Sequence, residues 1–140
     1  MYINKTMTTI IVAAVIFATA CNNREYSPSR KDLGQNMLDL KIYQENMGDH
    51  IKAGQLEDAV WLFEGMDSIL QVVNVTFDGH HKLDRPFSEY YDLKIKKPVN
   101  DLRQALKKND KAAALEGYRI LVRRCNSCHK DLDINKEVRF

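Results

Sequence analysis

Residues 114–132 read ALEGYRILVRRCNSCHKDL, and the spacing of the apolar side chains among them indicates how the chain folds. These side chains recur at intervals of four, three, four, three and four residues, which is the heptad pattern of a helix that packs along a seam. The pattern predicts a helix capped by Asn109-Asp110, with a seam of Ala114, Tyr118, Leu121, Cys125, Cys128 and Leu132.

Three stretches upstream have the same helical period. The first ends at Gly54, the second begins near Leu56, and the third follows Pro86, a residue suited to a first helical turn. Pro98 lies inside the third helix and predicts a kink there. Short connections within each pair of helices predict an all-α protein, an antiparallel four-helix bundle. The expected core positions upstream are Leu33, Met37, Leu40, Met47 and Ile51; Val60, Phe63, Met66, Leu70 and Val73; and Phe87, Tyr91, Ile95, Val99, Leu102 and Leu106.

The composition limits the class of protein. The chain has 140 residues, enough for one ordinary domain, and its formal net charge is only +2. A charge so near balance leaves no basic excess to neutralise a nucleic-acid backbone, so we expect no nucleic-acid partner. Six Gly and three Pro are too few for an all-β protein built from many turns.

The N-terminus has the pattern of an export signal. Residues 1–20 contain a short apolar run, Ile10 to Ala18, which is the length of a signal-peptide core rather than of a membrane span. The sequence Ala18-Thr19-Ala20-Cys21 resembles a bacterial lipoprotein signal, in which Cys21 would carry the lipid. Cleavage after Ala20 without lipid is the alternative. We therefore expect a signal peptide at 1–20, a lipidated tether at 21–30, and a bundle domain at 31–140, anchored to a bacterial membrane on the periplasmic side.

The last predicted helix contains Cys125-Asn126-Ser127-Cys128-His129, a C-x-x-C-H motif typical of c-type haem attachment. On a helix the two cysteines share a face and can add to the two vinyl groups of one porphyrin. His129 is four residues from Cys125, so its imidazole can approach the iron. A thioredoxin-like dithiol would need a βαβ setting, and a zinc site would need a second ligand pair at regular spacing. The motif predicts one haem c per chain.

A C-x-x-C-H on the last helix of a bundle, preceded by A-x-x-x-x-Y at Ala113 to Tyr118, resembles the cytochrome c prime class and its low-spin relatives. The resemblance implies a four-helix bundle with His129 as the proximal iron ligand. It also implies one of two arrangements on the distal side of the haem. Either a Met from the first helix binds the iron, which is typical of electron transfer, or the distal site is apolar and the iron five-coordinate, which is typical of proteins that bind nitric oxide or carbon monoxide. Met37 is the favoured distal ligand, and Met47 lies on the same stripe.

The remaining candidates are basic side chains beside the motif and histidines elsewhere in the chain. Arg123 and Arg124 could contact haem propionates, and together with Lys130 they could dock an acidic redox partner protein. The histidines His50, His80 and His81 are weaker candidates for iron ligation. We expect an exported electron carrier with no catalytic residues rather than an enzyme, with a gas-binding haem protein as the alternative; the bundle could form a homodimer. The aromatic residues expected in the core or against the haem are Trp61, Phe63, Tyr91 and Tyr118.

Overall fold

The computed structural model describes residues 33–77 and 82–140. Helices α3, η1 and α4 follow one another without a break and form a single rod, so the described chain consists of four long helical rods and contains no strand. The elements are α1 (Leu33–Ala53), α2 (Leu56–Thr76), α3 (Phe87–Tyr90), the π-helical turn η1 (Tyr91–Ile95), α4 (Lys96–Lys107) and α5 (Lys111–Asp131).

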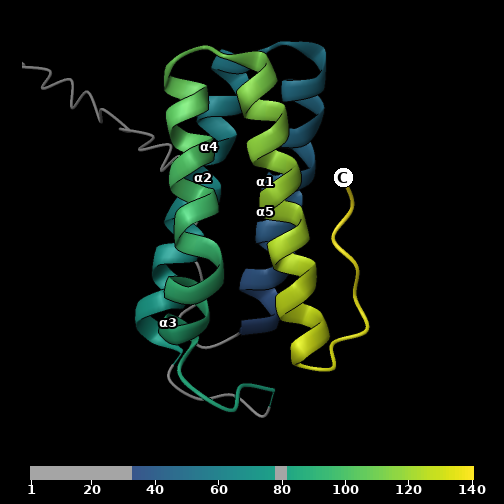
Figure 1. Cartoon of the computed structure of the whole chain (residues 1–140). Coiled ribbons are helices and arrows are strands. Elements are labelled where there is room, and N and C mark those ends of the chain that lie inside the picture. The colour runs from purple at the N-terminus through teal and green to yellow at the C-terminus, as the bar shows by residue number, and fades with distance from the viewer. Residues whose placement is uncertain (1–32, 78–81) are drawn as a thin grey trace, which may run out of the picture.

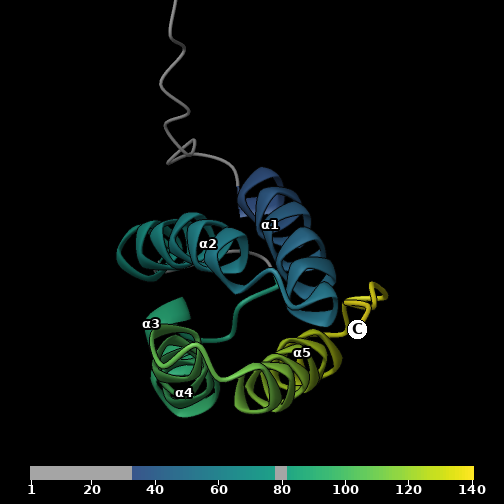
Figure 2. The same cartoon turned by 90° about the horizontal axis from the view of Figure 1, so that it is seen from above.

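The rods run alternately up and down, which confirms the prediction of a helical bundle (Figure 1). Seen along the bundle, α1, α2, α4 and α5 occupy four corners (Figure 2), and contacts join α1 to α2, α2 to α4, α4 to α5 and α5 to α1. The antiparallel order brings the start of α1 beside the end of α5 (Figure 1). The predicted motif and the favoured methionine therefore lie at the same end of the molecule.

Local backbone chemistry ends the helices where the sequence predicts. Gly54 has a φ of +81°, its amide donates to the carbonyl of Ile51 at 3.1 Å, and the Gln55 amide donates to that of His50 at 2.9 Å. This pair of bonds is the glycine-type termination that reverses the chain after α1. At the other tight turn the carboxylate of Asp110 accepts from the amide of Ala113 at 3.0 Å and caps α5.

The irregularity expected at Pro98 is a π-helical turn just before it. Proline has no amide hydrogen and its ring displaces the carbonyl four residues earlier, here that of Lys94 in η1. Within this turn the amide of Lys96 donates to the carbonyl of Tyr91, five residues back. The wider turn lets one continuous rod carry a proline in its interior.

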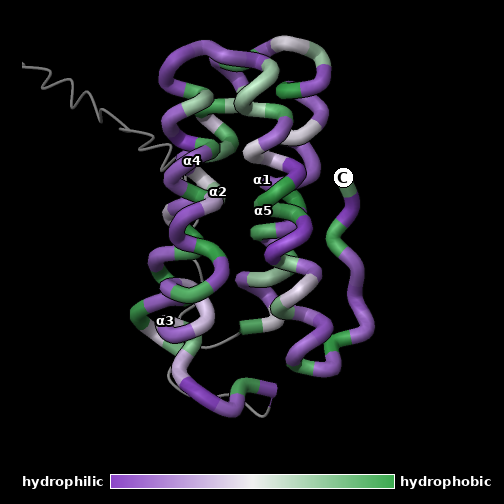
Figure 3. Tube along the Cα trace, viewed as in Figure 1, coloured by the Kyte–Doolittle hydropathy of each residue, from purple (hydrophilic) through white to green (hydrophobic). Residues whose placement is uncertain are grey.

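The apolar stripes form the core, and polar and apolar residues interchange along every helix (Figure 3). Most predicted core residues are buried, and Met37, Leu40, Val60 and Cys125 are partly buried and pack against the core. The prediction for Leu132 was wrong, because this residue follows the end of α5 and lies outside the core cluster, where it is partly exposed. The prediction for Trp61 was wrong, because its side chain is 78% exposed. Trp61 precedes the buried Phe63 by two residues, and two residues turn a helix by about 200°, to the opposite face.

Several predicted features lie outside the described residues. These are the signal peptide at 1–20, the lipidated tether at 21–30 with Cys21, and the loop residues His80 and His81. Among residues 33–77 and 82–140, no helix has the length and apolar content that crossing a bilayer requires.

Candidate functional site

The two cysteines of the motif face the interior of the bundle from the last turns of α5. Cys128 is buried, and Cys125 is partly buried and packs against the core. No disulfide joins them. Burial raises the pKa of Cys125 to about 12 and also raises the pKa of Cys128. Both thiols are therefore protonated at neutral pH, unlike the low-pKa thiols of disulfide oxidoreductases.

The imidazole of His129 has a defined hydrogen bond on one of its two nitrogens. Nδ1 of His129 lies 2.8 Å from the carbonyl oxygen of Lys136. A carbonyl oxygen can only accept, so the proton of the neutral ring is on Nδ1 and donates to Lys136. This tautomer leaves a lone pair on Nε2, which is the state in which histidine binds a metal ion.

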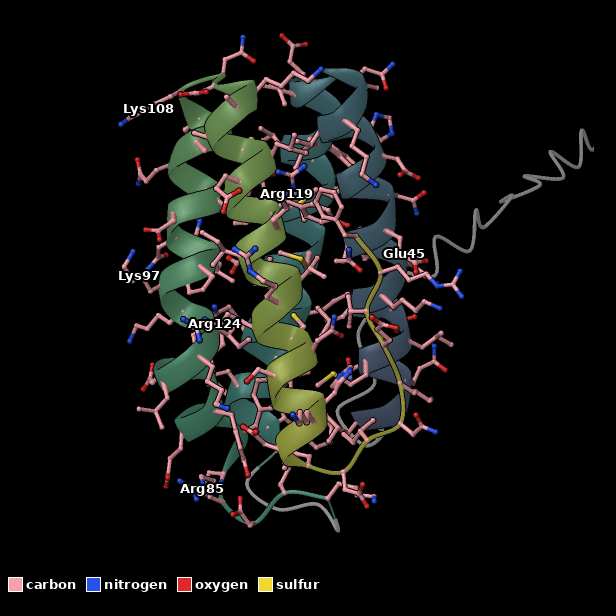
Figure 4. The ribbon with its side chains drawn as sticks, turned by 45° about the vertical axis from the view of Figure 1, so that its right-hand side comes forward. Glu45, Arg85, Lys97, Lys108, Arg119 and Arg124 are labelled. Carbon is pink, nitrogen blue, oxygen red and sulfur yellow. The ribbon has the colours of Figure 1, made fainter. Side chains whose placement is uncertain are left out.

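Lys136 belongs to the C-terminal segment, residues 133–140, which runs back along α5 on the side of α1 (Figures 1 and 4). The side chain of Asn126 holds this segment with two bonds to Val138: Nδ2 donates to the carbonyl at 2.9 Å and Oδ1 accepts from the amide at 2.7 Å. Nε2 of Gln44 in α1 donates to the carbonyl of Arg139 at 2.9 Å. The segment is thus attached to both helices.

A second contact of Gln44 fixes the register between α1 and α5. Its side chain is buried and hydrogen-bonds the hydroxyl group of Tyr118 in α5. Met37 is seven residues before Gln44, and Cys125 is seven residues after Tyr118. A helix rises 1.5 Å per residue, so Met37 and Cys125 each lie about 10 Å along the bundle axis from the Gln44–Tyr118 pair. Because the two helices are antiparallel, the displacement has the same direction in both, and the two residues lie at the same level.

The other candidate ligands of α1 lie at different levels. Met47 is fully buried in the core, ten residues beyond Met37, which is about 15 Å along the helix. His50 is farther still, and its Nδ1 lies 3.6 Å from Oδ2 of Asp58 in α2. The structure brings Met37, and neither of these residues, to the level of Cys125.

The two predicted propionate partners lie on the outer side of α5. Both are exposed, and with Ile120 they line a surface hollow of about 430 Å³. Arg123 donates to Oε1 of Glu116 at 3.3 Å. Arg124 extends on the side of α5 that faces α4 (Figure 4).

Lys94 of η1, which the sequence reasoning missed, holds the end of α5. Its ammonium group forms an ion pair with Asp131 and lies 3.4 Å from the hydroxyl oxygen of Ser127, inside the motif. A contact of this kind leaves no sequence signal, because Lys94 and Ser127 are brought together only when η1 and α5 pack.

Sequence reasoning also missed the buried polar side chains of α1. Asn36, Asp39 and Gln44 are buried, and burial raises the pKa of Asp39. Gln44 had a readable signal, because it occupies the heptad position between Leu40 and Met47, and a polar residue at such a position often fixes register. Asn126 had none, since its partner Val138 is in a segment without helical period.

In the described part of the chain, no three His, Cys, Asp or Glu side chains gather as ligands for a metal ion would. No family model, no curated protein and no solved structure matches the chain. The features that bear on function are those of α5, of the residues of α1 at the level of Cys125, and of the C-terminal segment.

Proposed function

We propose that the protein is a monohaem c-type cytochrome that carries single electrons. The observation that carries the proposal is the hydrogen bond from Nδ1 of His129 to the carbonyl of Lys136. His129 belongs to α5, the helix that also contains Cys125 and Cys128 one turn apart. Histidines that bind metal commonly donate their second ring proton to a carbonyl oxygen, which sets the tautomer and the ring orientation.

The donor set fits a covalently attached haem. Cys125 and Cys128 would form the thioether bonds, and their interior position would place a porphyrin against the core side of α5. Nε2 of His129 would hold the iron from the proximal side. Bound there, the haem would supply a one-electron iron couple, while the protein sets its position and surroundings.

Met37 is the proposed distal ligand. It is on the helix that packs against α5, at the level of Cys125, and its side chain is directed at the core. A His/Met pair of axial ligands raises the reduction potential, which suits an electron carrier.

One observation favours the alternative, a five-coordinate haem protein that binds nitric oxide or carbon monoxide. The neighbours of Met37 on the same stripe, Leu33 and Leu40, are apolar. If the Met37 thioether stayed in the core, Leu33 and Leu40 would offer the iron no ligand, and the distal side would be open to a small gas molecule.

The charge distribution supports an acidic redox partner that approaches the α4–α5 side. Residues 87–131, from the start of α3 to the end of α5, carry eleven Lys and Arg against six Asp and Glu, whereas α1 and α2 carry two against seven. Lys97, Lys108 and Arg124 belong to the basic half and Glu45 to the acidic half (Figure 4). Complementary charge of this kind accelerates encounter and orients the partner.

Export and a lipid at Cys21 would keep the carrier at a membrane surface on the periplasmic side.

Optical spectra of protein made in a host with c-type haem maturation test the proposal. We expect sharp low-spin haem bands on reduction and a sulfur-to-iron charge-transfer band in the oxidised state. A high-spin spectrum with rapid carbon monoxide binding would replace the electron-carrier proposal with the gas-binding one.

Two variants serve as controls for this experiment. His129→Ala should permit attachment through Cys125 and Cys128 while changing the iron spectrum, whereas Cys125→Ser with Cys128→Ser should prevent attachment. Protein that never acquires haem in a competent host would contradict both proposals.

A further inference from the structure

We propose that residues 133–140, here called the C-terminal clasp, position His129 for the iron by holding its Nδ1 proton on the main chain and by tying α5 to α1. The inference rests on the proposed function, because it concerns the same histidine. It adds a positioning role for Asn126 and for a segment that lies outside the four helices.

The clasp begins with a chain reversal directly after the motif. Asp133 has a φ of 50°, its amide donates to the carbonyl of Lys130 at 3.2 Å, and the amide of Ile134 donates to the carbonyl of His129 at 2.8 Å. These bonds end α5 and send the chain back along its own surface. His129 is therefore bonded to the clasp through its main chain as well as its ring.

The group that receives the ring proton is a main-chain carbonyl with a fixed direction. The amide of Lys136 donates to the carbonyl of Ile134 at 2.8 Å, which makes a tight local turn. The Lys136 carbonyl then accepts from Nδ1 of His129. Because the acceptor is in the backbone, the side chain at position 136 should have little effect on this bond.

Asn126 fixes the clasp beyond this turn. It precedes His129 by three residues, about one helical turn, so both side chains emerge on the same side of α5. Its amide group forms both hydrogen bonds of the Val138 main chain, as a neighbouring β-strand would. Asn126 is one of the two residues between Cys125 and Cys128, so a position that the C-x-x-C-H motif leaves unspecified has a structural role here.

The end of the clasp is held on α1. Gln44 donates to the carbonyl of Arg139, and the ring of Phe140 lies 5.4 Å from that of Tyr118, centroid to centroid. Lys52 of α1 and Arg119 of α5 lie over the Phe140 ring at 4.9 and 4.8 Å from its centroid. The clasp thus joins the helix with the proximal histidine to the helix with Met37.

The clasp has an electronic consequence as well as a geometric one. An imidazole that donates from Nδ1 to a carbonyl is a more basic ligand through Nε2. A more basic ligand favours the oxidised iron, so loss of this bond should raise the reduction potential. A segment that only stabilised the fold would leave the potential unchanged.

The test uses the full chain with and without haem, and compares Asn126→Ala with two controls in the clasp, Asn135→Ala and Lys136→Ala. In haem-free wild-type protein, nitrogen chemical shifts should show His129 with its proton on Nδ1. The Asn126→Ala variant should show mixed tautomers and about tenfold faster exchange of the Val138 amide, since two hydrogen bonds to Val138 are lost. Both controls should behave as wild type. Mixed tautomers in the wild type, or no change in Asn126→Ala, would overturn the inference.

The haem-loaded proteins give the second measurement. The reduction potential should rise in Asn126→Ala and in a chain that ends at Leu132, with the controls unchanged. An unchanged potential in Asn126→Ala, together with a lost Val138 bond, would reduce the clasp to a structural element and overturn the positioning role. Failure of all variants and of the wild type to acquire haem would contradict the proposed function, while the haem-free measurement would still decide whether the clasp sets the tautomer.

Discussion

Met37 on α1 and Cys125 on α5 lie at the same level of the bundle, each seven residues from the hydrogen-bonded pair Gln44 and Tyr118. Both side chains are partly buried and pack against the core. Met37 and Met47 lie on the same apolar stripe of α1, but the register of the two antiparallel helices brings only Met37 to the level of Cys125.

Replacement of Met37 by Leu should remove the sulfur-to-iron charge-transfer band of the oxidised haem protein and permit carbon monoxide to bind the reduced iron. The volume is nearly conserved, so the cost in stability should stay below about 1.5 kcal/mol. Met47→Leu is the matched control, in the core about 15 Å farther along α1, and its spectrum should equal that of the wild type. Identical spectra for Met37→Leu and wild type would exclude Met37 as a ligand.

Replacement of Gly48 by Ala should destabilise the seam between α1 and α5. A Cβ at position 48 would overlap the phenol ring of Tyr118. We expect a loss of about 1–3 kcal/mol from the overlap, offset in part by the higher helix propensity of Ala, in urea unfolding. A variant as stable as the wild type would show that Tyr118 does not pack against α1 at this point.

Tyr118 should contribute to a fall in the stability of the bundle in alkaline solution, in addition to the buried thiols of Cys125 and Cys128. Burial raises the pKa of Tyr118 to about 12 from an ordinary value of 10. The folded state therefore retains the phenol proton more strongly than the unfolded chain does. The contribution is complete below pH 10 and is lost as the pH rises from 10 towards 12.

Tyr118→Phe should make this alkaline decline smaller, measured by urea unfolding at a series of pH values. At neutral pH the variant should lose about 1–3 kcal/mol, because Gln44 is left buried without the hydroxyl group. An alkaline profile equal to that of the wild type would assign the decline to another group.

Replacement of Cys21 by Ser should move the protein from the membrane fraction to the periplasmic soluble fraction. Two or three acyl chains hold a protein stably at a bilayer, and the variant would have none. Wild-type protein found already in the soluble fraction would indicate cleavage after Ala20 without lipid.

Much of the bundle could be predicted from the sequence because each helix has an apolar stripe, and Gly54 and Asp110 mark two of the turns. The stripe on α5 correctly includes both cysteines. Trp61 was assigned to the interior by residue type, although its position relative to Phe63 places it on the outer face. Period, rather than residue type, was the reliable guide.

The C-terminal segment could not be predicted. Its bonds to His129, Asn126 and Gln44 involve main-chain carbonyls and amides, which every residue possesses. Such contacts depend on the path of the chain after Asp133 and leave no periodic pattern. The sequence therefore pointed to His129 as the proximal ligand of the proposed haem site but not to the main-chain group that its ring hydrogen-bonds.

Covalent attachment of haem is the most direct test of the central proposal. The full chain is produced in a host with c-type maturation, treated with acid and acetone, and its polypeptide mass is then measured. We expect the haem to remain on the polypeptide as one group per chain, and Cys128→Ser to weaken its retention. Haem that passes entirely into the organic phase, or a polypeptide with only its own mass, would contradict the proposal that Cys125, Cys128 and His129 form a c-type haem site.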